Sequence, residues 1–444
     1  MDKKLRIITA LFAIVLSVIL WTIPLPIAPQ AQIVLAILVF TMIFWFTEIL
    51  PLHVTSLLAA FLLITLGGFT PQETFAPFFD PVVVLIFGGF VLALGMQKHK
   101  LDETITYTIV NKVGASPGKI LFGIMALTAF LSMWMTNTAS TAVILPIALI
   151  ILAKNNLKPL SSNFGKAIVL GVAYAATLGG IGTLIGSTPN AMSAKFLADN
   201  AISLSFLDWM FYAMPLVLIM IPVTWFVLMK LFKPEINSLK TGFSVEPLNK
   251  NQKLVSGIFI ITVALWLTTT FTGLNNATIA LVPFILLYIL GLLKTEDISK
   301  INWAALLLFG GGLALGTAIH TSGLDLEIAK VLESFVINQP YFLILLIVIA
   351  FAFILSIAAS NTASAAIMLP LVIPLALLLN IDPKILVVAA AIGVSLDFIV
   401  PVGTPPNTIA YSSGYIKAKD MAISGLIIAV IGILVLTTWA YLFW

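Results

Sequence analysis

The sequence has no cysteine and very little charge. Of its 444 residues only 9% are Asp, Glu, Lys or Arg, and Arg6 is the single arginine; soluble domains carry about 25% charged residues. The absence of cysteine excludes disulfides, thiolate nucleophiles and cysteine-ligated metals. The net charge of +4 comes from lysines scattered over many segments, so we expect no nucleic-acid partner.

Long apolar segments are what the sequence has in abundance. Hydrophobic residues make up 61% of the chain, and the mean hydropathy is +1.14. Stretches long enough to cross about 30 Å of hydrocarbon as helices recur along the whole length. This pattern predicts an all-α polytopic membrane protein, with the lipid bilayer as its surroundings. Uninterrupted spans are expected near 6–23, 33–50, 53–69, 81–98, 205–230, 254–271, 277–293, 303–319 and 422–443.

Two similar polar phrases lie 224 residues apart inside apolar runs. The first is Leu-Ser-Met-Trp-Met-Thr-Asn-Thr-Ala-Ser at 131–140, and the second is Leu-Ser-Ile-Ala-Ala-Ser-Asn-Thr-Ala-Ser at 355–364. Each contains a small polar triplet, Thr136-Asn137-Thr138 or Ser360-Asn361-Thr362. Polar groups in the hydrocarbon are costly. A membrane protein that repeats such a triplet in each half is expected to build one site from the two halves.

Further matches in the same order extend this repeat. Phe-Gly-Gly at 87–89 matches Phe-Gly-Gly at 309–311, and Pro146 matches Pro370. Gly-Ser-Thr-Pro-Asn at 186–190 matches Gly-Thr-Pro-Pro-Asn at 403–407, where glycine and proline interrupt a helix. We therefore expect two repeats, each with a re-entrant hairpin and a broken helix.

The lysines predict the orientation of the repeats. With the hairpins at 117–153 and 340–380 leaving on the side they enter, and single broken helices at 166–195 and 384–416, 19 of the 22 basic residues fall on one side. By the positive-inside rule this side is the cytoplasm. The prediction is an inner-membrane protein of about eleven transmembrane helices plus two hairpins, with its N-terminus inside and its C-terminus outside.

The predicted organisation has two halves around a polar linker. Residues 1–30 form an N-terminal helix, 31–232 the first repeat, 233–253 a cytoplasmic linker and 254–444 the second repeat. Span 81–98 and its counterpart 303–319 run in opposite directions, so the repeats are inverted. Inverted repeats with interrupted helices near the midplane are typical of secondary transporters.

The hairpin tips suit an anion and a cation together. We expect Asn137 and Thr138 to cap the second arm of the first hairpin, whose N-terminus favours an anion. Carbonyl ends of the first arm and side-chain oxygens of Ser132, Thr136 and Asn137 suit a monovalent cation. No lysine or arginine lies in the core of any span. Co-bound cations and helix ends must then neutralise the anion, which predicts cation-coupled anion transport.

These motifs resemble those of the divalent anion–sodium symporters, the INDY-type di- and tricarboxylate transporters. The paired triplets, the paired Gly-x-x-Pro-Asn loops and the element Thr47-Glu48-Ile-Leu-Pro51-Leu-His-Val-Thr55 cover nearly the whole chain in the family's order. The resemblance implies a homodimer in which a scaffold domain holds a transport domain that moves like an elevator. It also implies sodium-coupled symport of a C4-dicarboxylate such as succinate, malate or fumarate.

The resemblance assigns site residues in both repeats. It implies one sodium ion held by Ser132, Thr136, Asn137 and Gly186, and a second held by Ser356, Ala359, Asn361 and Gly403. It implies a dicarboxylate held by Asn137, Thr138, Asn361, Thr362, Thr404 and Pro405, with Ser187 as a neighbour.

Three departures from the family pattern leave alternatives open. Thr136 replaces a serine, Ser187-Thr188 replaces Thr-Pro, and Asp397 lies in an apolar run. The Asp397 hypothesis is that it tunes cation coupling or carries a proton. Some relatives are sodium-independent dicarboxylate exchangers, and this is the alternative function. A channel would also use hairpins and inverted repeats, whereas an enzyme is not expected, because the sequence shows no acid–base or nucleophile pair.

Overall fold

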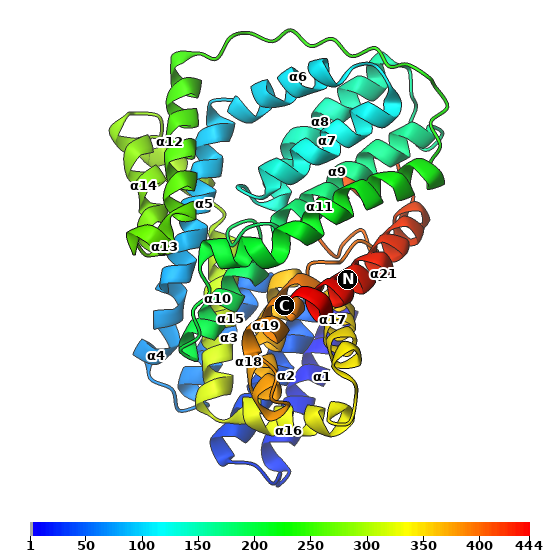
Figure 1. Ribbon diagram of the computed structural model, residues 1–444. Helices are drawn as coiled ribbons and strands as arrows, with labels where there is room; N and C mark the ends of the chain where they lie inside the picture. Colours follow the sequence, from blue (N-terminus) through cyan, green and yellow to red (C-terminus); the bar gives the residue numbers. More distant parts are fainter. Residues whose placement is uncertain (1–2) are drawn as a thin grey trace.

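The computed structural model describes residues 3–444, and all regular secondary structure within this range is helical (Figure 1). Ten helical segments in this range are long and apolar enough to cross a membrane, and four shorter helices are also apolar. This confirms the prediction of a polytopic all-α membrane protein.

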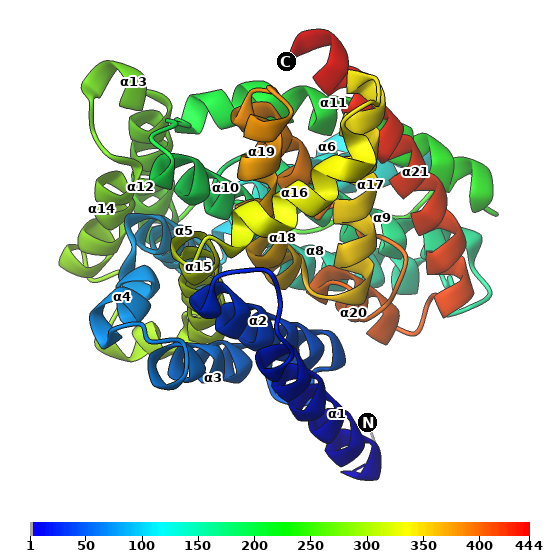
Figure 2. The ribbon, with the colours of Figure 1, turned by 90° about the horizontal axis from the view of Figure 1, so that it is seen from below.

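One group of helices is built on close pairs. α5 packs on α14, α3 on α15, and α1 on α2. A Cβ atom on Gly88 would lie 2.3 Å from the carbonyl oxygen of Ala280, so glycine is required for α5 to approach α14. α1 projects from the body beyond α2 (Figure 2). The group comprises α1 (Lys3–Thr22), α2 (Pro29–Thr47), α3 (Leu52–Thr65), α5 (Pro81–Lys98), α12 (Lys250–Leu267), α14 (Asn276–Ile289) and α15 (Trp303–Thr321).

A second group contains the hairpins and the broken helices. α7 and α11 pack on α9, whereas α17 packs on α19 and α21. The group comprises α7 (Pro117–Ser132), α8 (Asn137–Lys154), α9 (Asn163–Ile181), α10 (Thr188–Asp199), α11 (Phe206–Leu231), α17 (Tyr341–Ala358), α18 (Asn361–Leu378), α19 (Pro383–Gly393), α20 (Pro405–Ser412) and α21 (Ala418–Phe443).

The predicted interruptions are present, with shifted boundaries. α7 and α8 form the first hairpin, and α17 and α18 the second, each with its polar triplet at the turn. The breaks at 182–187 and 394–404 differ in length, because α19 ends at Gly393 whereas α9 continues to Ile181. The linker is shorter than predicted, since Asn249 already caps α12 by accepting a hydrogen bond from the Gln252 N–H.

Both ends of each hairpin lie at the same end of the molecule. The Ala115 carbonyl, just before α7, accepts a hydrogen bond from Leu239, and Asn155, just after α8, bonds Lys240 in both directions. The second hairpin begins and ends against α16 (Leu324–Val336), through Ile344 and Leu375.

The two hairpins enter from opposite ends of the molecule. α6 (Leu101–Val113) and the linker lie at the end opposite to α16 (Figure 1). The halves are therefore inverted. Which end faces the cytoplasm stays a prediction.

α6 and α16 occupy equivalent places in the two repeats, directly after α5 and α15, and the sequence pattern did not predict either helix. Smaller elements complete the chain: α4 (Pro71–Phe75), the 3-10 helix η1 (Ala76–Phe79), α13 (Thr269–Thr272) and the 3-10 helix η2 (Thr295–Lys300).

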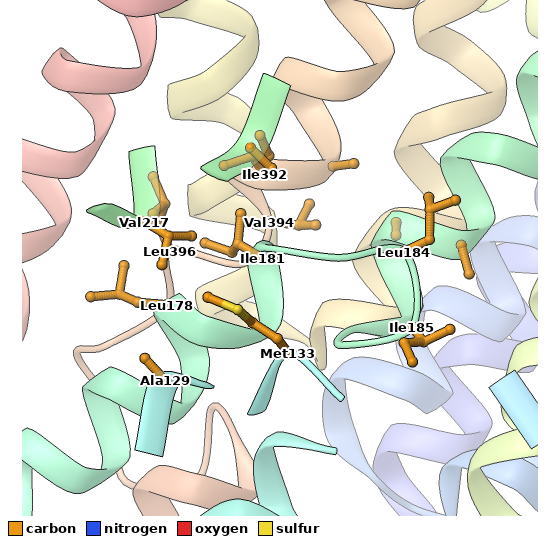
Figure 3. Close-up of a cluster of buried hydrophobic side chains, with 14 of the residues drawn as sticks. Ala129, Met133, Leu178, Ile181, Leu184, Ile185, Val217, Ile392, Val394 and Leu396 are labelled. Carbon is orange, nitrogen blue, oxygen red and sulfur yellow. The ribbon is translucent and has the colours of Figure 1, made fainter. Parts of the chain in front are cut away.

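An apolar core holds the interrupted segments of both repeats together. Ala129 and Met133 of the first hairpin lie beside Ile181 of α9, and Val394 and Leu396 of the second broken segment reach the same cluster (Figure 3). All five are at most 8% exposed. The loops that follow α9 and α19 are thus fixed by packing, although they lack regular helix.

Candidate functional site

A cavity of about 210 Å³ lies between the two groups of helices. The triplets of both hairpins and both Gly-x-x-Pro-Asn loops line it. Among residues 3–444, none of those that line it is charged. The lining residues from the second group are Thr136, Asn137, Thr138, Ile185, Gly186, Ser187, Thr188, Ser360, Asn361, Thr362, Gly403, Thr404, Pro405 and Pro406.

Four helices begin at this cavity. The first residues of α8, α10, α18 and α20 all line it. The first N–H groups of a helix have no acceptor inside it, and its N-terminus carries a partial positive charge. Two helices from each repeat therefore direct positive ends at the cavity, which favours an anion. Free N–H donors come mainly from the hairpin helices α8 and α18, because α20 begins with Pro405 and Pro406, which have no N–H.

The residues that cap the hairpin helices differ from the prediction. Thr136 Oγ1 accepts from the Ala139 N–H at 3.1 Å, and Ser360 Oγ accepts from the Ala363 N–H at 3.3 Å. The cap is thus the first residue of each triplet, not Asn137 or Thr138. Capping places the cap residue just before the helix and leaves the next two N–H groups free. The side chains of Asn137 and Thr138 are consequently available to other partners.

The side-chain amide of Asn137 faces three oxygen atoms. Ser132 Oγ lies 2.7 Å away, the Ala176 carbonyl 3.1 Å and the Gly186 carbonyl 3.2 Å. With its nitrogen toward them, the amide donates to all three. With its oxygen toward them, four oxygens converge, and only the Ser132 hydroxyl can donate a hydrogen. The second arrangement gathers four oxygen atoms of the kind that bind a cation. It brings three of the predicted first-site residues together with Ala176, which the sequence did not indicate.

The second repeat contains the corresponding arrangement. Ser356 Oγ lies 2.8 Å from Asn361 Oδ1 and donates to the Val394 carbonyl at 2.5 Å. Gly403 lines the cavity beside Asn361. Ala359 precedes the capping serine, does not line the cavity, and uses its N–H to close the last turn of α17. Val394 takes part although no sequence motif contains it.

The asparagines of the Gly-x-x-Pro-Asn motifs hold the broken-helix loops. Asn190 Nδ2 donates to the Thr183 carbonyl at 2.7 Å, and Asn407 Nδ2 donates to the Val400 carbonyl at 3.1 Å. Thr183 and Val400 are equivalent in the repeat. Both asparagines are fully buried. These side chains therefore hold the loops in place without lining the cavity. The cavity surface is formed by the residues that precede them, 185–188 and 403–406.

The remaining predicted ligands lie on the cavity surface. Thr138, Thr362, Ser187, Thr404 and Pro405 all line it. Thr404 also caps α20, because its hydroxyl accepts from the Asn407 N–H at 3.4 Å.

The sequence prediction missed Thr188. Its hydroxyl forms a hydrogen bond with the hydroxyl of Thr362, which connects the first broken helix to the second hairpin. The alignment of the two repeats could have indicated it, because Thr188 is equivalent to Pro405, which was predicted as a ligand.

One wall of the cavity comes from the first group of helices. It consists of Leu52, Ile86, Phe90, Asn302, Ala305 and Leu308. Asn302 caps α15 by accepting from the Ala305 N–H at 3.1 Å. None of these residues lies in the repeated motifs, so the sequence prediction missed this wall. Asp397 does not line the cavity and lies behind Gly403.

The fold and the site define an inverted-repeat membrane protein whose cavity receives two hairpin tips and two broken helices, the architecture of a secondary transporter. Residues 4–444 match the family model described as the sodium:sulfate symporter transmembrane region. The chain belongs to this family, which confirms the resemblance to divalent anion–sodium symporters and agrees with the expectation of a transporter rather than an enzyme.

Curated relatives cover most of the chain. An uncharacterized transporter of Haemophilus influenzae is 34% identical over 439 residues, which is 95% of this chain and 93% of the relative. The sodium-dependent dicarboxylate transporter SdcS of Staphylococcus aureus (strain USA300) is 34% identical, and the match covers 90% of this chain and 84% of the relative. SdcS of Staphylococcus saprophyticus is 33% identical, and the match covers 92% of this chain and 85% of the relative.

A solved structure supports the fold. The crystal structure of the YdaH transporter of Alcanivorax borkumensis superposes with a TM-score of 0.60, covering 99% of this chain and 98% of the other. At 16% identity this likeness concerns the fold alone.

Proposed function

We propose that this protein carries C4-dicarboxylates across the cytoplasmic membrane by sodium-coupled symport. The observation that carries the proposal is the meeting of four helix N-termini at a cavity whose lining, within the described residues 3–444, has no charged side chain. A dianion gains favourable interactions with the helix ends. Without a basic side chain, the rest of its charge must be balanced by cations bound nearby.

The symmetry of the site favours a substrate with two separated anionic groups. Each repeat supplies one Asn-Thr pair, Asn137-Thr138 or Asn361-Thr362, at the start of a helix. One carboxylate at each pair uses both halves, whereas a single compact anion would engage them less equally. The S. aureus and S. saprophyticus relatives named as dicarboxylate transporters support this choice of substrate.

Sodium suits the oxygen clusters behind the two hairpin tips. The first sodium ion would be held by Ser132, Asn137, Gly186 and the Ala176 carbonyl, with Thr136 at the hairpin tip. The second would be held by Ser356, Asn361, Gly403 and the Ala359 and Val394 carbonyls. Neutral oxygen donors favour hard cations. Each ion would lie beside an Asn-Thr pair, so sodium and dicarboxylate would stabilise each other's binding.

We further propose an elevator motion in a homodimer. The first group of helices would be the scaffold and the second the transport domain. The cavity has walls from both groups, so a displacement of the second group would carry both hairpin tips and their ligands away from the scaffold wall together.

A sodium-independent dicarboxylate exchanger is the second candidate, and one observation favours it. With its nitrogen turned inward, the Asn137 amide satisfies Ser132, Ala176 and Gly186 without any cation. In that state the first cage is closed by the protein itself.

Uptake of radiolabelled succinate into proteoliposomes tests the proposal. Symport requires an external sodium gradient and no internal substrate. Uptake that is unaffected by sodium but depends on internal dicarboxylate would establish exchange instead. Saturable uptake with counterflow is expected in either case, whereas single-channel currents would reveal a channel.

A further inference from the structure

Asp397 is a buried acid that has no charged partner among residues 3–444. Its side chain is fully buried. Among residues 3–444, no donor reaches its Oδ2 atom, and Oδ1 accepts only a long bond of 3.4 Å from the Ile399 N–H. In the same range no lysine, arginine or histidine pairs with it. A buried carboxylate without a pairing charge is strongly unfavourable.

The carboxylate lies directly against Gly403, one of the residues proposed to hold the second sodium ion. A Cβ atom on Gly403 would lie 2.1 Å from Asp397 Oδ2, so this oxygen rests directly on the glycine. Gly403 lines the cavity. Earlier in the same loop, the Val394 carbonyl is bonded to Ser356, which also contacts Asn361. The loop at 394–404 therefore presents Asp397, Val394 and Gly403 to one region.

The equivalent position of the first repeat points into the first cluster. The offset that aligns Gly186 with Gly403 aligns Gly180 with Asp397. A Cβ atom on Gly180 would lie 2.1 Å from Asn137 Oδ1. A side chain at Gly180 would therefore meet Asn137 of the first oxygen cluster, although Gly180 lies in α9 whereas Asp397 lies in the loop after α19. In the first repeat this position is Gly180, and the Asn137 side chain fills the space beside it. In the second repeat the equivalent residue is Asp397, which carries a carboxylate.

We propose that the Asp397 carboxylate is a direct ligand of a sodium ion at the second half-site. The inference rests on the proposed sodium coupling and deepens it. The ion supplies the charge partner that the carboxylate lacks, and the carboxylate gives this site a full negative charge that the first cluster does not have. The second site therefore binds sodium before the dicarboxylate arrives, whereas the neutral first site depends more on the substrate.

Sodium binding without substrate tests the assignment. Purified protein is titrated with sodium replacing choline, and the thermal unfolding midpoint is followed. Ser132→Ala serves as the background, because it weakens the first site. Adding Asp397→Asn should raise the half-maximal sodium concentration at least tenfold. In choline alone this variant should unfold at the same or a higher temperature, because a buried unpaired charge has been removed.

Asp102→Asn is the matched control. Asp102 is 1% exposed and its Oδ2 atom has no partner within residues 3–444, but it lies on α6, away from the cavity. Its replacement should leave the sodium titration unchanged. An unchanged titration for Asp397→Asn, while Ser356→Ala still weakens sodium binding, would overturn the assignment and leave symport intact. Failure of symport itself appears separately, as sodium-independent uptake by the unaltered protein.

A second measurement needs no variant. Dicyclohexylcarbodiimide modifies buried carboxyl groups, and peptide mass spectrometry identifies the modified residue. Sodium should slow the modification of Asp397 but not that of Asp102. Modification of Asp397 at the same rate in sodium and in choline would contradict the proposal, even if Asp397→Asn did not fold.

Discussion

The hydroxyl groups of Thr188 and Thr362 are hydrogen bonded to each other, although the residues are 174 positions apart. Thr188 is the first residue of α10, and Thr362 lies in the first turn of α18. Both line the cavity. The bond therefore connects the broken helix of one repeat with the hairpin of the other at the place where substrate is proposed to bind. The two repeats form one site rather than two adjacent ones.

Removing either hydroxyl should weaken substrate binding. We expect Thr188→Val to raise the half-saturating succinate concentration about fivefold, because a lost hydrogen bond costs about 1 kcal/mol. Thr188→Ser should retain most of the affinity. Thr362→Val should weaken binding further, because Thr362 is also a proposed substrate ligand. The double variant should nevertheless be little worse than Thr362→Val alone, since the bond is already lost in that variant. Uptake kinetics in proteoliposomes measure these effects.

Thr437→Val is the control for this experiment. Thr437 is fully buried in α21 and donates to the Ile433 carbonyl of its own helix at 2.7 Å. It should leave the succinate dependence unchanged. Fully additive effects of Thr188→Val and Thr362→Val would show that the two hydroxyls act independently.

The serines behind the hairpin tips should determine sodium dependence. Ser132 and Ser356 lie 2.7 and 2.8 Å from the Oδ1 atoms of Asn137 and Asn361, respectively. Each change to alanine removes one oxygen from a proposed cage. We expect a rise of about three- to tenfold in the half-saturating sodium concentration for uptake.

Thr128→Val tests whether the effect is specific to these serines. Thr128 is buried in α7, and its hydroxyl donates to the Ile124 carbonyl of the same helix at 2.7 Å. It is expected to keep the sodium dependence of the unaltered protein. If Ser132→Ala and Ser356→Ala behaved in the same way, the cages would not hold sodium.

Polar residues inside a membrane made the hairpin tips predictable. Because Asn137 and Asn361 recur in the same context, their repetition outweighed the simpler interpretation of each as a contact between helices. The same logic located Gly186 and Gly403. The distribution of lysines predicted that the two hairpins enter from opposite sides, and in the structure they enter from opposite ends of the molecule.

The wall that the first group of helices contributes to the cavity could not be predicted in this way. Phe90 and Asn302 reach the cavity only because α5 and α15 pack against the second group of helices. Their sequence neighbourhoods resemble any other transmembrane helix. The sequence predicted Ser187 rather than Thr188 as a ligand for a related reason. Which residue begins α10 depends on where the break ends, and Gly-Ser-Thr-Pro-Asn permits several starting points. Val394 and Ala176 contribute backbone carbonyls, which any residue type can provide.

An ion pair connects the two groups of helices. Lys195 of α10 lies 3.5 Å from Asp80, which caps α5. An elevator motion would separate these residues. We therefore expect a cysteine at each position, joined by a short bis-maleimide, to stop succinate uptake. Because the sequence contains no native cysteine, the reagent can react only with the two introduced cysteines.

A matched crosslink within one group is the control. Lys98 and Asp297 form an ion pair at 2.5 Å, and both lie at the same end of the first group. Cysteines at 98 and 297, joined by the same reagent, should leave uptake largely intact. Full uptake by the crosslinked 80–195 variant would exclude a relative movement of the two groups at this point.

Asp297 should contribute to stability in a pH-dependent way. It accepts from Lys98 Nζ at 2.5 Å, from Lys300 Nζ at 2.9 Å and from the Lys294 N–H at 2.8 Å. These donors, led by Lys98, hold the pKa of its carboxyl well below the usual range. The ionised form is therefore favoured by folding. Its contribution is present above the unfolded pKa of about 3.9 and is lost as the pH falls through the lower folded pKa.

Asp297→Asn should accordingly destabilise the protein by about 1–2 kcal/mol at pH 7, because it weakens hydrogen bonds to charged donors, of which Lys300 is largely exposed. The deficit in the thermal unfolding midpoint should persist down to about pH 5 and shrink below about pH 4. Glu296→Gln, at an exposed neighbouring position, should show no comparable deficit. A deficit for Asp297→Asn that stayed constant into strong acid would mean that packing, rather than the carboxylate charge, stabilises this end of α5.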